Sequence, residues 1–532
     1  MNMANKQIFR EIKFGDLVFP VTLLIYFFLN LWIILASNAH ALLNDFWVLR
    51  EISERTQWSD PSSLYDGFFP YLYPLLLKLV PDSLLLHTTA FLSLIAACLT
   101  IVFVYLSAKY LVGPIWAIVA AWIIALQPQF FSYATVSSAD ALAALPVAAA
   151  LWVLIREWRH DNPRFGPALF FAGLLIGIGA SLRYHALLLI IIPLALGLSI
   201  SGLRRRATLA VISGFLLGYL PQIVINASAG EMPWSTMQGF NMYRQAVGVD
   251  WNATDSLNPD LFASPLSVIL NNPASFTMNY LTAFSNFAFP LVVVVTAAFL
   301  SRGSRWNAIM WSMAVGALAF ALTSSTAFSD RTLIVFMPIW AISAAWIFQQ
   351  GSEKLTRLSN WKKDFRSRLT PLLQYCLISV LLLWGTIPWI QSDLESGIAR
   401  TELEASRANY EASFLSSVNV SSMTEVFSND FNFYTLEVPG FVPLHNGGIA
   451  AISQQGTTMA PAVDVSGIQP FLCDSFGRNI QATIWNPGNG SGTEPELNAV
   501  LSGQSENSQI LARSIEGLVV SDIVFTSEPC WQ

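Results

Sequence analysis

Charged residues are scarce in this chain of 532 residues. Lys, Arg, Asp and Glu together make up 12% of it, whereas 54% is hydrophobic and the mean hydropathy is +0.51. A soluble domain carries about 25% charged residues. The composition therefore argues against an ordinary soluble protein and predicts a polytopic membrane protein. The net charge is −6, and no basic run indicates a nucleic-acid partner.

Long stretches without charge predict eleven membrane spans, because about 20 apolar residues cross the hydrocarbon core. They lie near 17–36, 84–108, 115–133, 139–155, 165–182, 184–201, 207–227, 277–300, 306–327, 332–350 and 371–391. We expect the first to be a retained anchor, since its apolar stretch exceeds the central region of a typical signal peptide. Only Arg183 separates 165–182 from 184–201, so these are either a tight hairpin or one broken segment.

The distribution of charge predicts the topology. With a cytoplasmic N-terminus, the predicted cytoplasmic pieces hold 18 of the 28 Lys and Arg but 6 of the 34 Asp and Glu. This bias follows the positive-inside rule. We therefore expect a multi-pass protein of the plasma (inner) membrane, with a membrane domain over 1–391 and long outside loops at 37–83 and 228–276. The first loop is predicted to be amphipathic, and the second to be a lid or a membrane-surface loop.

An odd number of spans places residues 392–532 outside the membrane. This tail is predicted to be an extracytoplasmic mixed α/β domain, with strands at 424–428 and 517–525 and helices at 402–416 and 494–513.

Cysteine is also rare, with four residues and no Cys-x-x-Cys or zinc-finger spacing. Cys98 and Cys376 lie in predicted spans, where packing explains them. Cys473 and Cys530 lie in the outside tail, where a disulfide is chemically permitted. We predict that these two pair.

The predicted span cores contain no Asp, Glu, Lys or Arg, and this absence disfavours an ion-coupled transporter. The charges that approach the outer face are Asp45, Asp140, Arg183, Asp330 and Arg331. They come from four separate connections, and we expect them to converge. A carboxylate can accept the proton of an acceptor hydroxyl. An arginine can bind a phosphate through two hydrogen bonds and stabilise its charge as it leaves.

Each of these residues also has a structural interpretation. Asp45 and Asp140 suit helix N-caps. Arg331 can also be explained by an ion pair with Asp330 or by binding to lipid headgroups. Lys78 can be explained by a buried apolar stem whose ammonium group extends to the interface. Arg183 and His185 are also typical of residues that mark the interface. Both interpretations stay open for these residues at this point.

The order of short motifs resembles the GT-C superfamily of integral-membrane glycosyltransferases, in its protein-mannosyltransferase-like and aminoarabinose-transferase-like branch. The motifs are Asn44-Asp45, the run from Gly67 to Leu76, Leu126-Gln127-Pro128, Ala139-Asp140-Ala141-Leu142, Arg183-Tyr184-His185, and Asp330-Arg331-Thr332-Leu333. Many members carry Asp-Glu in the first loop. Here Phe46 follows Asp45, and the next acid is Glu51.

The resemblance implies a GT-C-like fold and sugar transfer from a polyprenyl-phosphate donor at the outer face of the membrane. It implies Asp45 as the base, with Asp140 supporting it or holding a metal. Arg183 and Arg331 would meet the donor phosphate, and Lys78 and His185 are further candidates there. The implied partners are membrane lipid, the lipid-linked donor, and a glycan, lipid or protein acceptor. No cofactor is required, and a divalent metal is left open.

Two other functions stay open. A transporter or flippase of lipid-linked saccharides predicts a polar path across the membrane. A polysaccharide polymerase or ligase predicts a site dominated by arginine. A large separation between Asp45 and Asp140 would favour these two.

Overall fold

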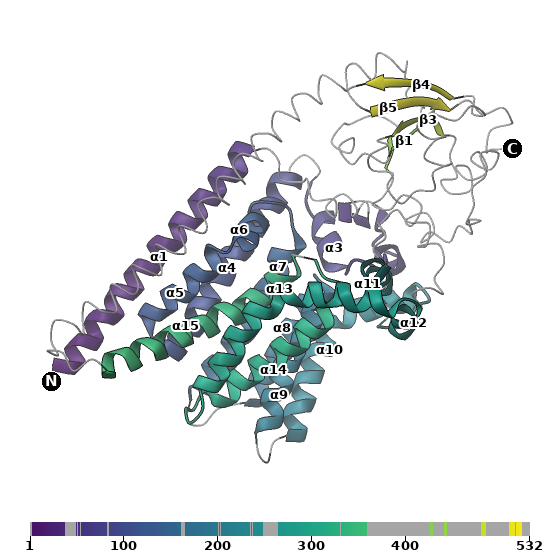
Figure 1. The fold of residues 1–532 in the computed structure, drawn as a ribbon. Coiled ribbons are helices and arrows are strands. Elements are labelled where there is room, and N and C mark those ends of the chain that lie inside the picture. The colour runs from purple at the N-terminus through teal and green to yellow at the C-terminus, as the bar shows by residue number, and fades with distance from the viewer. Residues whose placement is uncertain are drawn as a thin grey trace. The chain divides into compact units, whose positions relative to one another are not determined.

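The computed structural model describes most of the membrane part of the chain and five strands of the tail (Figure 1). The described residues are 3–37, 49–50, 52–53, 55–81, 85–160, 165–200, 202, 204–234, 236, 238–247, 264–329, 331–358, 425–428, 441–443, 480–485, 510–515 and 518–523. The chain divides into two units. One comprises Met1–Leu43, Ile52–Ser235 and Leu281–Arg400, and the other comprises Asn44–Glu51, Thr236–Tyr280 and Thr401–Gln532.

The described part of the first unit is helical. Its α-helices are α1 (Met3–Ser37), α3 (Leu72–Lys78), α4 (Leu85–Val112), α5 (Pro114–Ala125), α6 (Pro128–Ala134), α7 (Ala139–Trp158), α8 (Phe165–Ala180), α9 (Ile191–Ser199), α10 (Arg204–Ser228), most of α13 (Pro273–Leu300), α14 (Asn307–Ser324) and α15 (Thr332–Leu358). Two 3₁₀ helices, η1 (Pro61–Leu64) and η3 (Tyr184–Ile190), lie between them.

Seven of the described helices are long and apolar enough to cross a membrane, and an eighth span is formed if the bent pair α5 and α6 counts as one. Ten of the eleven predicted spans coincide with these helices or with the shorter apolar segments Phe165–Ala180 and Tyr184–Ser199. The eleventh, near 371–391, lies outside the described residues. The chain is therefore an integral membrane protein, and the count of eleven stays a prediction.

The predicted span at 115–133 is not one straight helix. The chain bends by 70° between α5 and α6. The cause is Pro128, because a residue that precedes proline is pushed out of the helical region. Gln127 accordingly adopts φ −73° and ψ 124°, and its side-chain oxygen accepts a hydrogen bond from the Phe130 N–H at 3.3 Å. Proline thus ends α5 and begins α6.

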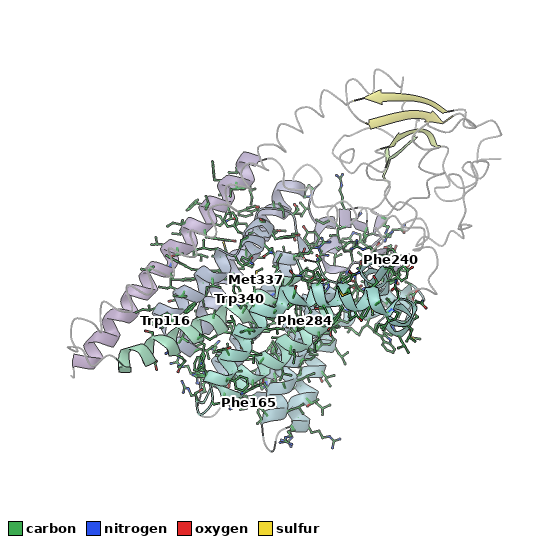
Figure 2. The ribbon with its side chains drawn as sticks, in the orientation of Figure 1. Trp116, Phe165, Phe240, Phe284, Met337 and Trp340 are labelled. Carbon is green, nitrogen blue, oxygen red and sulfur yellow. The ribbon has the colours of Figure 1, made fainter. Side chains whose placement is uncertain are left out.

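The core of the helical unit is built around α7, which packs against α4, α8 and α15. The helix α15 also packs against α4 and α5, and Figure 2 marks its side chains Met337 and Trp340. A group of aromatic rings joins three helices, since Phe287 of α13 makes edge contacts with Phe320 of α14 and Phe336 of α15. Other helices carry exposed apolar side chains, among them α1, α10 and α13.

Helices α8 and α10 approach each other through glycine. Each carries a Gly-x-x-x-Gly motif, Gly173 to Gly177 in α8 and Gly214 to Gly218 in α10. A methyl group at any of the four would overlap a backbone carbonyl oxygen of the facing helix. Small residues at this spacing let two membrane helices pack backbone to backbone. The α8–α10 contact therefore has no room for a side chain at these positions.

The described part of the second unit contains α11 (Gln238–Val247), α12 (Pro265–Asn271) and the first two turns of α13. The C-terminal carbonyls of α11 are satisfied by side chains of α13. The Ser275 hydroxyl donates to the Ala246 carbonyl at 2.6 Å, and the Asn279 amide donates to the Gln245 carbonyl at 2.7 Å. Leu266 and Leu270 of α12 are exposed, and the two alternatives for this loop, a lid or a membrane-surface loop, stay predictions.

The tail contributes a mixed sheet of five strands to the second unit. The strands are β1 (Glu425–Ser428), β2 (Phe441–Pro443), β3 (Ile480–Trp485), β4 (Ile510–Ile515) and β5 (Leu518–Ile523), in the order β2-β1-β3-β5-β4. β1 pairs in parallel with β2 and β3, and β5 is antiparallel to β3 and β4. The predicted strands at 424–428 and 517–525 are both present.

The predicted helix over 494–513 is wrong at its C-terminal end. Residues from Ile510 onward form β4, in which Ile510 faces Ile523 and Ile515 faces Leu518. Only Glu516 and Gly517 separate the two strands, which is the sequence length of a tight hairpin connection. Pairing with β5 therefore overrides the helical spacing of the sequence. The predicted helix at 402–416 lies outside the described residues.

The close packing of α8 on α10 predicts that the loss of stability caused by a Gly→Ala substitution in α8 depends on the position of the glycine. Gly177→Ala places a methyl group against the Phe215 carbonyl, and overpacking of this kind costs about 1–3 kcal/mol. Gly166→Ala in the same helix meets open space, so it serves as the matched control. Thermal unfolding of the purified protein in detergent, followed by tryptophan fluorescence, should show a lower Tm for Gly177→Ala alone. Equal Tm values for the two variants would contradict the packing.

Candidate active site

Asp140 lies at the first turn of α7, on a frame of serine hydroxyls. Ser138 is the N-cap, and its hydroxyl accepts from the Asp140 N–H and donates to Asp140 Oδ2, both at 3.0 Å. Ser93 of α4 holds Ser138, since its hydroxyl accepts from the Ser138 N–H at 3.1 Å. The alternative interpretation of Asp140 as the N-cap is therefore wrong. Ser138 is the N-cap, so the Asp140 carboxylate is available for another role.

Arg183 reaches Asp140 from the connection between α8 and η3. It is extended, with φ −148° and ψ 123°, and its N–H donates to the Gly179 carbonyl at 2.9 Å. Its Nη2 lies 2.8 Å from Asp140 Oδ2. The two side chains are 12% and 5% exposed, and the guanidinium lies 5.7 Å from the centre of the Phe69 ring. The pair is therefore a nearly buried ion pair.

The Ser138 hydroxyl and the Arg183 guanidinium both donate to Oδ2 of the Asp140 carboxylate. Within the described part of the chain, Oδ1 has no hydrogen-bond partner. One oxygen of this carboxylate is thus fixed by the protein, and the other has capacity for a further donor or a cation.

The start of α3 is hydrogen-bonded to the connection after α8 and to α10. The Leu72 N–H donates to the Ser181 carbonyl at 3.1 Å, and the Tyr71 N–H donates to Gln222 Oε1 of α10 at 2.9 Å. These bonds place Tyr73 with a side chain only 1% exposed, in electrostatic contact with Arg183 and Asp140 and facing the Thr89 hydroxyl.

Burial raises the pKa of the Tyr73 phenol, and the negative charge of Asp140 adds to this, although Arg183 and Thr89 oppose it. The phenol therefore stays protonated at neutral pH and can act only as a neutral donor or acceptor. Sequence reasoning missed Tyr73. Its only signal was its place in the aromatic run from Gly67 to Pro74 that opens α3.

His185 and Arg331 join the same group from two further segments. The imidazole of His185, in the first turn of η3, lies near the backbone of Ala327 and interacts electrostatically with Arg183, Asp140 and Arg331. Arg331 precedes α15, and its Nε donates to the Ser329 hydroxyl at 3.1 Å. Of the five residues predicted to converge, Asp140, Arg183 and Arg331 thus meet from three connections, at the start of α7, after α8 and before α15. His185 joins them, although it was not in that predicted set.

For the remaining predicted site residues, the structure shows only the position of Lys78. Lys78 is in the last turn of α3, five residues after Tyr73, and its contribution to a phosphate site stays a prediction. Asp45, Asp330, Cys473 and Cys530 lie outside the described residues. In the described ranges no three His, Cys, Asp or Glu side chains converge, so those residues do not by themselves form a complete metal site.

Comparison with known proteins places this geometry in a structural context. Residues 68–227 match the sequence profile of the dolichyl-phosphate-mannose-protein mannosyltransferases. This range holds Tyr73, Asp140, Arg183 and His185. No curated protein sequence matches the chain.

Solved structures of membrane glycosyltransferases share the fold. ArnT from Cupriavidus metallidurans bound to undecaprenyl phosphate aligns with a TM-score of 0.53 and 13% identity, over 96% of this chain and 98% of that one. The apo form of the same enzyme gives 0.51 and 12%, over 95% and 97%. The Archaeoglobus fulgidus oligosaccharyltransferase in complex with Zn and sulfate gives 0.52 and 13%, over 94% and 72%. The predicted resemblance to GT-C glycosyltransferases is confirmed.

The buried pair makes stability depend on both of its members. Arg183→Met leaves the Asp140 carboxylate nearly buried without its counter-charge, and such a loss lowers the free energy of unfolding by about 3–5 kcal/mol. Adding Asp140→Asn to Arg183→Met should restore part of the loss, because no uncompensated charge remains. Thermal unfolding of the single and double variants measures this coupling. The exposed Arg206→Met is the control. Strictly additive losses would show that the two side chains do not interact.

Proposed function

We propose that this protein is a membrane glycosyltransferase that moves a sugar from a polyprenyl-phosphate donor to an acceptor hydroxyl at the outer face of the membrane. The observation that carries the proposal is the group formed by Asp140, Arg183, His185 and Arg331. It combines two guanidiniums with one carboxylate, so it suits an anion. Arginine holds phosphate through paired hydrogen bonds and stabilises the charge on a leaving phosphate.

The reaction needs a base as well as an anion site. Asp45 follows α1 by eight residues, and we assign it this role. It takes the proton of the acceptor hydroxyl while the acceptor oxygen bonds to the anomeric carbon of the sugar. The bond between that carbon and the phosphate oxygen breaks, and polyprenyl phosphate leaves with the electron pair. Arg183 and Arg331 hold the phosphate, and Asp140 holds Arg183 in place.

A lipid-linked donor agrees with the position of the group. Asp140 is in the first turn of an apolar helix, Arg183 joins two apolar segments, and Arg331 directly precedes another. A phosphate anchored in the headgroup layer reaches such a place without leaving the bilayer. The structure of ArnT with undecaprenyl phosphate supports this class of donor. The acceptor is a glycan, a lipid or a protein.

The placement of charge favours an enzyme over a flippase. Across the seven candidate spans, every Asp, Glu, Lys and Arg lies in the first or last turn. A transporter that moves a charged saccharide carrier would place ionisable side chains deeper in the membrane. We therefore assign residues 1–391 as the catalytic membrane domain, with a cytoplasmic N-terminus in the plasma (inner) membrane. Residues 392–532 are assigned to an extracytoplasmic domain, in which Cys473 and Cys530 pair.

The phosphate role of Arg331 predicts a selective loss in Arg331→Lys. Lysine keeps the charge but loses the fork of two parallel donors. In proteoliposomes supplied with a panel of undecaprenyl phosphosugars, the variant should raise the KM for the donor more than it lowers kcat. Arg206→Lys, at the start of α10, is the matched control. Wild-type donor kinetics in Arg331→Lys would leave Arg331 with a structural role only.

The base role of Asp45 predicts a loss in rate without a loss in folding. Asp45→Asn keeps the size of the side chain and its capping ability, but an amide cannot accept the proton. Release of undecaprenyl phosphate should fall by about 10²–10⁴-fold, while Tm and donor affinity stay near wild type. A variant that keeps most of its activity would rule out Asp45 and leave Asp140 or Glu51 as the next candidate.

A further inference from the structure

A strip of positive charge lies at the end of α7 opposite the candidate active site. Asp140 and Trp158 are separated by 18 residues of one helix, a distance of roughly 27 Å. Around Trp158 the connections of three helices meet. They carry the basic strip, defined here as Lys109, Arg156, Arg159, Arg302 and Arg305.

Two contacts tie these connections into one surface. The Trp158 indole N–H donates to the Arg305 carbonyl at 2.8 Å, which fastens the end of α7 to the turn between α13 and α14. The Arg159 guanidinium lies 5.1 Å from the centre of the Tyr110 ring at the end of α4. The strip is therefore continuous from α4 through α7 to the α13–α14 turn, although its residues are far apart in the sequence.

The cations of the strip rest on aromatic rings. Arg302 lies 4.6 Å from the centre of the Phe299 ring, Arg305 lies 4.8 Å from Trp306, and Arg156 lies 5.1 Å from Trp152. Arg156, Arg159, Arg302 and Arg305 remain exposed. Rings of this kind gather where a membrane meets water. The guanidiniums are thus exposed beside aromatic rings of the kind that mark the headgroup level.

The local charge is strongly unbalanced. Over residues 152–164 and 299–306 the sequence holds five arginines against two carboxylates, Glu157 and Asp161. Long apolar side chains continue from the strip along the span. Phe299 is 47% exposed, and Val315, Leu318 and Leu322 form an exposed stripe on α14. A partner that fits must present negative charge at the strip and apolar chains beside it.

We propose that the basic strip binds the headgroups of anionic phospholipids, with their acyl chains along the exposed faces of α13 and α14. Arginine pairs with a phosphodiester through two hydrogen bonds. Each basic residue near an anionic membrane surface favours binding, and the effect falls off within a Debye length. This binding is independent of sugar transfer, because it uses the opposite end of the helices.

The test compares lipid binding by the full-length chain. Purified protein in a neutral detergent is titrated with phosphatidylglycerol and with phosphatidylcholine, and bound lipid is counted by native mass spectrometry. Wild type should prefer phosphatidylglycerol by roughly a hundredfold, as expected for several arginines acting together. The triple variant R159Q/R302Q/R305Q should lose most of this preference, and high salt should weaken it.

The matched control is R204Q/R205Q/R206Q, which removes the same charge at the start of α10. Gln222, near the other end of α10, bonds to Tyr71 on the side of the active site, so these arginines lie at the same end of the helices as the strip. The control should keep the preference. An equal loss in both triple variants would overturn the proposal in favour of unspecific attraction. It is also overturned if wild type shows no preference, or if glycerol 3-phosphate alone binds as well as the lipid. A single Arg302→Gln variant gives the same readout if a triple variant fails to fold.

Discussion

The low dielectric of the bilayer is the constraint on which the rest of this structure depends. A charged side chain costs about 2.5–3.5 kcal/mol at the centre of a membrane helix. In the seven candidate spans, charged residues are accordingly confined to the helix ends. One set of ends holds Asp140, Arg183 and Arg331, and the opposite set holds the basic strip. The charged groups of these described helices are thereby confined to two layers, one at each end of the spans.

The packing of α8 against α10 connects this constraint to the geometry of the site. Because glycines bring the two helices together, the Ser181 hydroxyl lies 3.3 Å from the Gly218 carbonyl oxygen. Ser181 and Gln222 then receive the backbone N–H groups of Leu72 and Tyr71. The same contact that closes the two helices therefore fixes the start of α3 beside Arg183. A looser fit would move the Arg183 guanidinium relative to Asp140.

The sequence allowed much of this arrangement to be predicted, because uncharged stretches and isolated charges are both local signals. The helices and the meeting of Asp140, Arg183 and Arg331 followed from them, whereas the expected participation of Asp45 and Asp330 lies outside the described residues. Three features did not follow. Ser138 took the cap from Asp140 through a bond to Ser93 of another helix. Tyr73 gained its role from neighbours distant in sequence, and β4 formed through its pairing with β5. Each depends on tertiary contacts, which a single sequence does not display. The roles of Asp45 and Lys78 remain predictions.

The central claim is that Arg183 and Arg331 together form the site of a lipid-linked phosphate. A structure of the full-length protein in a lipid nanodisc with undecaprenyl phosphate tests it most directly, by cryo-electron microscopy. We expect phosphate density within hydrogen-bond distance of both guanidiniums, with Arg183 still paired to Asp140. Phosphate density at the basic strip alone, with neither Arg183 nor Arg331 in contact with it, would contradict the account.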